Sequence, residues 1–231
     1  MYIRYIIMTY VKEGKMSYKL LAEKLLRDKE KIITRDKIRG YTKTLKLSYG
    51  SAIGYLLNNE YVIRILRGVF YVKSLEERKN HTIDIPFYEA ITKALEIKNV
   101  KNWYFGLESA IKLNNLTHEY FAMDYIISDK LKRPRSIEIL DHKVKFIAIK
   151  KGLTTFGKAK GNVPYSDVEK TILDKMYLGI YRGVPESSIK NSIIDYIYKC
   201  NRKRLMEYAK HYPKTVLGLI IRIKNDKQRD Y

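Results

Sequence analysis

Three neighbouring residues near the middle of the chain carry side chains that could support phosphodiester hydrolysis. Asp141, His142 and Lys143 form an acid–x–Lys element within the stretch EILDHKVKF. In metal-dependent nucleases, carboxylates on adjacent strands hold Mg²⁺ and a lysine lies near the scissile phosphate. Asp124 or Asp129 could supply a second carboxylate. Because D-x-K also arises by chance in a lysine-rich chain and suits a turn between strands, a metal-dependent DNA nuclease is the alternative hypothesis.

A second group of polar side chains lies within the stretch NVPYSDVEKTILD. The pattern from Ser166 to Glu169 is that of an S-x-x-E capping box, which predicts a helix beginning near Ser166. Lys170 and Asp174 are four residues apart, so they could pair on the helix surface for about 0.3–0.5 kcal/mol. Together with Thr171 they could also be interpreted as a catalytic acid, base and cation. Capping and surface pairing are the favoured interpretation.

Other familiar kinds of chemical site are missing from the sequence. The chain has one cysteine, Cys200, and its four histidines are scattered without H-E-x-x-H spacing. It contains neither a G-x-x-x-x-G-K-[ST] phosphate loop nor a G-x-S-x-G nucleophile elbow. The sequence therefore predicts a protein that is not an enzyme and that needs no metal or cofactor.

The charge balance points to a polyanionic partner. Lys and Arg number 46 against 25 Asp and Glu, a formal net charge of +21 with a pI near 9.7. Such an excess favours nucleic acid through attraction and counterion release, although a lysine-rich or thermophilic proteome could also produce it. The single cysteine indicates a reducing compartment, and no apolar run reaches the ~18 residues of a membrane span. We expect a soluble cytoplasmic protein without a signal peptide.

Residues 1–80 show the element order of a winged helix-turn-helix domain. Helical spacing covers Ser17–Glu30, and Thr34 could cap a second short helix, Arg35–Arg39, that Gly40 ends. Ser48 could cap a third helix over about Tyr49–Asn59. The stretch VIRILRGVFYV then alternates as two short strands around Arg67-Gly68, where a tight turn needs the positive φ that glycine allows.

In such a domain the third helix enters the major groove of DNA and the hairpin contacts the backbone or the minor groove. The candidate base-reading residues are Tyr49, Ser51, Tyr55 and Asn58. The candidate phosphate contacts are Lys37, Lys43, Lys46, Arg64 and Arg67. Ordinary solvated helix surface is the competing interpretation for each residue. Winged helices also serve as protein-interaction modules, so an assembly factor that binds no DNA is a further alternative.

The remainder, residues 81–231, is predicted to be an α+β domain ending in helices. A polar, charged stretch from Ser74 to Pro86 is the expected linker. A helix at FYEAITKALEIKN, a strand and helix in WYFGLESAIKLNNL, and strands in HEYFAMDYIISD and RSIEILDHKVKFIAIKK follow it. From Pro185 onward the pattern is helical, and Pro213 separates a last helix over Thr215–Ile223.

Three stretches in this order resemble the AbiEi antitoxin family of abortive-infection toxin–antitoxin systems. They are YLLNNEYVIRILRGVFYV, WYFGLESAIKLNNL and VPYSDVEKTILDKMYLG, which together with their flanks span residues 34–183. The resemblance implies an N-terminal winged helix that represses its own operon at inverted repeats. It also implies a C-terminal domain that opposes a nucleotidyltransferase-like toxin without need of a stable complex. The motif residues Ser166, Glu169, Lys170, Thr171 and Asp174 would belong to that domain, and either a monomer or a homodimer would suit paired half-sites.

Overall fold

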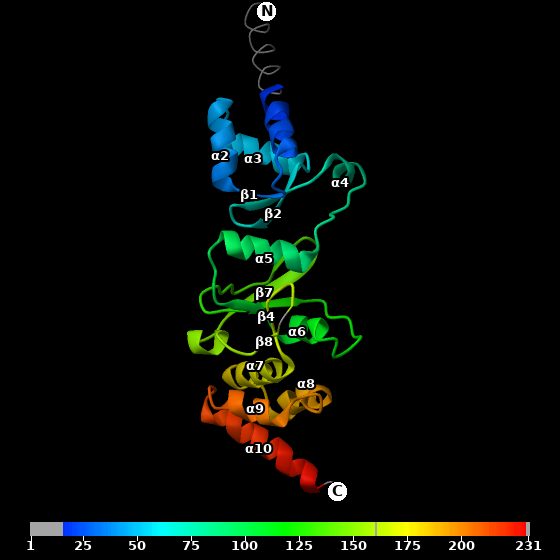
Figure 1. The fold of residues 1–231 in the computed structure, drawn as a ribbon, viewed down its shortest axis with the longest axis vertical. Coiled ribbons are helices and arrows are strands. Elements are labelled where there is room, and N and C mark those ends of the chain that lie inside the picture. Colours follow the sequence, from blue (N-terminus) through cyan, green and yellow to red (C-terminus); the bar gives the residue numbers. More distant parts are fainter. Residues whose placement is uncertain (1–15, 160, 230–231) are drawn as a thin grey trace, which may run out of the picture. The chain divides into compact units, whose positions relative to one another are not determined.

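The computed structural model describes residues 16–159 and 161–229, and the chain divides into two compact units after Asn99. Each unit has its own sheet, as Figure 1 shows. The first unit holds three strands and the second holds six. The fold class is mixed α+β, with a winged-helix-like first unit, as the sequence predicts.

The first unit begins with a helix that covers the described residues 16–27. The elements that follow are β1 (Ile32–Thr34), α2 (Arg35–Thr44), α3 (Tyr49–Asn58), β2 (Val62–Leu66), β3 (Val69–Val72), α4 (Leu75–Lys79) and α5 (Phe87–Ile97). The strands form an antiparallel sheet in the order β1-β3-β2. This order of helix, strand, helix, helix and two-stranded ribbon confirms the predicted winged-helix arrangement (Figure 1).

Helix α2 is longer than its sequence indicates. The side chain of Thr34 caps it by accepting a hydrogen bond from the backbone N–H of Lys37 at 3.2 Å, as expected. The predicted end at Gly40 is wrong, because the helix continues to Thr44. Ile38 and Thr42 on its inner face are buried, so packing of the second turn outweighs the weak helix propensity of glycine.

The hairpin that follows α3 forms as predicted. Gly68 has φ +78° at its turn, where only a glycine is free of strain. Val62, Phe70 and Val72 are buried in one core with Leu21 and Leu25 from the first helix. The ribbon is therefore held against the helices by apolar burial along its length.

The predicted linker Ser74–Pro86 is wrong in its first half. It contains α4, which Ser74 and Glu77 cap reciprocally in a capping box. The Glu77 carboxylate is buried and accepts hydrogen bonds from the Tyr71 hydroxyl at 2.6 Å and the Asp84 N–H at 2.9 Å. This segment is thus pinned to β3. Helix α5, which the predicted boundary at residue 80 assigns to the second domain, contacts all three strands of the first sheet.

The second unit combines a mixed six-stranded sheet with helices. Its elements are β4 (Trp103–Phe105), α6 (Leu107–Leu113), β5 (Asp124–Ser128), β6 (Ile137–Ile139), β7 (His142–Ala148), η1 (Lys151–Thr154), β8 (Lys158–Ala159), β9 (Tyr165–Ser166), α7 (Val168–Tyr181), α8 (Glu186–Ile197), α9 (Arg202–Ala209) and α10 (Lys214–Arg229). The strand order is β6-β7-β5-β4-β9-β8, with parallel pairing of β5 to β7 and of β4 to β9.

Helix α7 is the centre of the second unit. It contacts α6, α8, α9 and α10, and its side chains share one apolar core with Tyr104, Ile127 and Ile147 of the sheet. Figure 1 shows α8, α9 and α10 following it in sequence. Pro213 separates α9 from α10, as predicted. Within the part of the chain that the structure describes, no helix is both long and apolar enough to cross a membrane.

Candidate nucleic-acid interface

The exposed face of α3 is small, polar and uncharged. Ser51 and Asn58 are exposed, as expected for residues that could reach base edges. Gly54 lies about one turn and Gly50 about two turns before Asn58, on the same face of the helix. A Cβ added to Gly54 would meet no atom of the described chain within 4 Å, and one added to Gly50 would meet only the Ser48 hydroxyl at 3.9 Å. Internal packing therefore does not require either glycine.

The two tyrosines of α3 lie elsewhere than expected. Tyr55 is half-buried, and its ring stacks between Tyr18 at 5.2 Å and Tyr61 at 5.8 Å between centroids. Burial and a hydrogen bond with Tyr61 raise the pKa of the Tyr55 hydroxyl. Tyr49 is also half-buried, and the Arg39 guanidinium lies 5.2 Å from its ring centroid. Both rings hold α3 against its neighbours, so Ser51 and Asn58 remain the base-reading candidates.

Lys37 is engaged inside the protein and is not available to a phosphate. Its Nζ lies 2.6 Å from a carboxylate oxygen of Asp28 and 2.9 Å from one of Glu30. Hydrogen bonds to these two carboxylates raise the pKa of Lys37, and the bond from Lys37 lowers the pKa of Asp28. The expectation of a phosphate contact from Lys37 is therefore corrected: its charge is already neutralised.

The other predicted phosphate contacts are exposed. Lys43 and Lys46 lie at the end of α2 and in the turn before α3, and Arg64 and Arg67 lie on β2 and in the hairpin turn. Among the residues that the structure describes, none of the four forms an ion pair of 4.0 Å or less. Arg64 lies 5.8 Å from the ring centroid of Phe70, which orients its stem along the ribbon. No spacing pattern in the sequence marks Arg39, an exposed cation of α2 whose guanidinium lies against the Tyr49 ring.

The polar motif on α7 is a buried network and not a surface. Lys170 and Asp174 are both 0 % exposed, and Lys170 Nζ lies 3.2 Å from Asp174 Oδ1. Asp174 also accepts hydrogen bonds of 2.7 Å from the hydroxyls of Tyr104 and Tyr212. The expectation of a surface pair is wrong, because α7 runs through the middle of the unit and its polar side is covered by β4 and the segment after α9.

Aromatic rings enclose the Lys170 ammonium group. Its Nζ lies 4.8 Å from the ring centroid of Phe156, 4.9 Å from that of Tyr104 and 5.5 Å from that of Tyr212. Burial lowers the pKa of Lys170, and Asp174 opposes that shift. Burial also raises the pKa values of Tyr104 and Tyr212, so both hydroxyls stay protonated and donate to Asp174. A satisfied network of this kind fixes one packing arrangement.

The predicted capping box at Ser166 is also wrong. Asp167 caps α7 by accepting from the Lys170 N–H at 2.9 Å, while Ser166 lies in β9 with its hydroxyl 2.7 Å from that of Thr171. Glu169 is buried and accepts from the backbone N–H of Asn201 at 2.7 Å. Asp167, the residue after Ser166, supplies the cap. The side chains of Ser166 and Glu169 instead bond to neighbouring segments.

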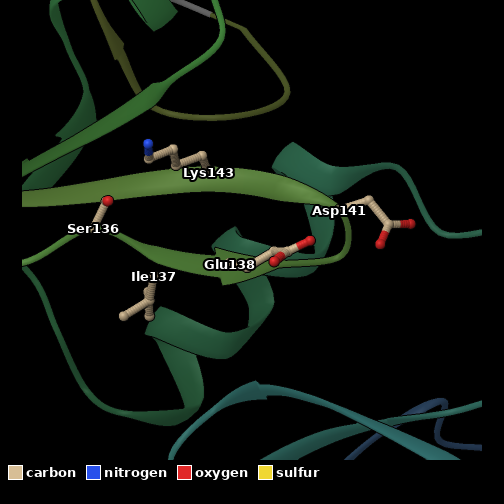
Figure 2. A pocket seen from close by; sticks show the side chains of 5 residues that line it. All are labelled: Ser136, Ile137, Glu138, Asp141 and Lys143. Carbon is tan, nitrogen blue, oxygen red and sulfur yellow. The ribbon is translucent and has the colours of Figure 1, made fainter.

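The acid–x–Lys element does not form a carboxylate pair. Figure 2 shows Asp141 at the β6–β7 turn with its carboxylate directed away from Lys143, beside an open depression of about 470 Å3. Asp124 is buried, where it accepts from Ser109 at 2.7 Å and lies 2.9 Å from His142 Nδ1. Asp129 accepts from Asn102. Among the described residues, no three His, Cys, Asp or Glu side chains converge as a metal site would need.

The order of elements and the sheet topology define a winged-helix-like unit followed by an α+β unit. No protein-family model matches the chain, and no curated protein matches it. Among solved structures, the crystal structure of the RV2827C protein from Mycobacterium tuberculosis is similar, with a TM-score of 0.57 at 12 % identity. The alignment covers 90 % of this chain and 76 % of that one. At this identity the likeness shows a shared fold.

Proposed function

We propose that the chain is a DNA-binding transcription regulator whose α3 enters the major groove. The observation that carries the proposal is the exposed face of α3. This face is uncharged, and at Gly50 and Gly54 it carries no side chain that would keep another surface at a distance. The cations Lys43 and Lys46 lie just before the helix in the chain. Glycine costs an exposed helix about 1 kcal/mol relative to alanine. Such a cost without internal need is consistent with close approach to another surface, and a groove edge is such a surface.

The division of roles follows the usual one at protein–DNA interfaces. Ser51 and Asn58 would contact base edges, with Asn58 able to pair bidentately with an adenine. Lys43, Lys46, Arg64 and Arg67 would contact phosphates, which positions the protein without reading sequence. The exposed state of all six side chains supports this assignment.

The test is a titration of fluorescent duplex DNA from upstream of the chain's own gene, with a shuffled duplex of equal length as the control. At near-physiological salt, a specific regulator binds its own site at least about 10³-fold more tightly than other DNA. Equal affinity for both duplexes would reject specific repression. Sedimentation of the complex would show whether a monomer or a homodimer occupies inverted repeats.

For the second unit we propose the antitoxin role that the AbiEi resemblance implies, without catalytic activity of its own. Its support is the order of three sequence stretches and a compact α+β unit that follows a winged-helix-like unit in the chain. Co-expression with a neighbouring nucleotidyltransferase-like protein should restore the growth of cells that the latter arrests. Continued arrest with soluble antitoxin present would reject this role and leave the DNA-binding proposal in place.

A further inference from the structure

Three cations from separate elements of the first unit converge on the turn of the hairpin. They are Arg35 at the start of α2, Arg67 in the turn, and Lys98 directly after α5. All three line one depression of about 290 Å3, together with Thr34, Asp36, Gly68, Val69 and Ile97. We infer that this depression takes one backbone phosphate of the bound duplex, an inference that rests on the proposed function.

A backbone hydrogen bond ties two walls of the depression together. The Arg35 N–H donates to the carbonyl oxygen of Gly68 at 2.8 Å, which ties the start of α2 to the hairpin turn. A Cβ placed on Gly68 would lie 3.5 Å from Cβ of Arg35 and 3.7 Å from Nζ of Lys98. Lys98 therefore reaches the turn itself, because α5 packs on the sheet and ends beside it. Pre-positioned cations bind an anion with little loss of conformational entropy.

The charge within the depression is unbalanced. Asp36 is its one acidic lining residue, and its carboxylate is 3.9 Å from Arg35 Nε and 4.0 Å from Arg39. Asp36 is 81 % exposed at its side chain, so these contacts are weak. Like charges held together repel each other, and an anion placed between them relieves the repulsion. A phosphodiester fits the location, since the hairpin of a winged helix meets the DNA backbone.

Sequence reasoning missed Lys98 because it lies beyond the boundary that sequence composition indicates. Only the packing of α5 against the first sheet brings it to the hairpin turn. Lys98 is thus a candidate phosphate contact supplied by an element outside the helix-turn-helix and its ribbon.

The experiment measures how affinity depends on salt for full-length Lys98→Gln, with Lys93→Gln as a matched control. Lys93 lies on α5, five residues before Lys98, and is also exposed, but it pairs with Glu89. Each phosphate contact contributes about 0.9 to the slope of log affinity against log salt. Lys98→Gln should lower the slope by that amount. The ratio of wild-type to variant affinity should therefore fall about three- to fourfold between 50 and 200 mM salt. Lys93→Gln should leave the slope unchanged.

Two further arms separate a phosphate contact from a folding defect. Asp36→Asn should tighten binding, an effect of opposite sign that a damaged fold would not give. A scan with single neutral methylphosphonates in the duplex should find one position at which Lys98→Gln costs no further affinity. The scan uses the chain's own upstream duplex, where the register is fixed, whereas the change in salt slope must appear on shuffled DNA as well.

Equal slopes for the Lys98 and Lys93 variants would overturn the inference, even if the wild type prefers its own upstream DNA. Absence of that preference would reject the proposed regulator instead. Salt slopes measured on the shuffled duplex test the phosphate site whether or not the chain prefers its own upstream DNA.

Discussion

Helices α3 and α7 both carry polar residues that the sequence marks as functional, but these residues are exposed in α3 and buried in α7. In α3, Ser51 and Asn58 face solvent, and the helix keeps two glycines that its own packing does not need. In α7, Lys170 and Asp174 are fully buried and held by tyrosine hydroxyls. The comparison teaches that polar spacing along a helix identifies a face, whereas the surrounding elements decide whether that face meets solvent or the core.

The largest expected effect is on the α7 network. Asp174→Asn should destabilise the second unit by about 3–5 kcal/mol, because it leaves Lys170 as an unpaired buried charge. Urea unfolding followed by circular dichroism measures it, with Lys93→Gln, at an exposed ion pair, as the control that changes stability by less than about 0.5 kcal/mol. A loss below about 1 kcal/mol for Asp174→Asn would mean that the network is not buried as described. Combining it with Lys170→Met should recover part of the loss.

Acid should weaken the first unit through Glu77. Burial acts to raise its pKa, but hydrogen bonds from Tyr71, the Asp84 N–H and the Ser74 N–H outweigh burial and lower the pKa to about 2. A lowered pKa in the folded state gives stability that is complete above the unfolded pKa, near 4.5, and is lost as the pH falls toward 2. The contribution at neutral pH is on the order of 3 kcal/mol, at about 1.4 kcal/mol for each pKa unit.

Glu77→Gln should therefore be less stable than wild type at pH 7, and the difference should close between pH 4.5 and 2. Thermal melts across that range measure it. Glu76→Gln is the matched control, since Glu76 is the exposed neighbour on the same short helix. A constant difference from pH 7 to pH 2 would contradict the proposed origin of the effect.

Gly54→Ala should separate stability from binding in α3. The change should stabilise the first unit by about 1 kcal/mol, since alanine favours a helix and its methyl group meets nothing within 4 Å. The same methyl should weaken DNA binding if the helix approaches a groove closely. Gly152→Ala in the second unit, also free of neighbours within 4 Å, should leave DNA affinity unchanged. A Gly54→Ala variant with wild-type affinity would show that close approach does not explain the glycine.

The smallest expected effect distinguishes Lys43 from Lys37. Lys43→Gln should lower the salt slope of DNA binding by about 0.9, as removal of one phosphate contact does. Lys37→Gln should leave that slope unchanged, because Asp28 and Glu30 already neutralise its charge. The same anisotropy titration serves both variants. Equal reductions for the two would restore Lys37 as a phosphate contact.

Much of the fold is predictable from local chemistry. The Thr34 cap and the glycine turn at Gly68 follow from preferences of single residues for backbone geometry. Helix α3 begins after Ser48 as predicted, but the expected cap is wrong, because the Ser48 side chain makes no capping hydrogen bond. The end of α2 and the cap of α7 do not follow from such preferences. At Gly40 packing overrode propensity, and at α7 two adjacent residues, Ser166 and Asp167, could each have served as the cap.

The candidate site is only partly readable from the sequence. Exposure of Ser51 and Asn58 follows from helical periodicity once Ala52 and Leu56 are buried. The stacking of Tyr55 does not follow, because a tyrosine suits both solvent and a half-buried contact. The neutralisation of Lys37 depends on Asp28, nine residues earlier, whose position is set by the end of the first helix.

By itself, the sequence determined an α+β protein with a winged-helix start, a strongly basic charge and a helix bearing small polar residues. Periodicity, caps and turns settle these features because each depends on residues within a few positions of one another. Tertiary structure alone decided that Lys170 lies among aromatic rings, that Lys37 pairs with carboxylates of the protein itself and that Lys98 lies beside the hairpin turn. Those outcomes depend on contacts between residues distant in the chain, and the free energy of a charge depends on what surrounds it.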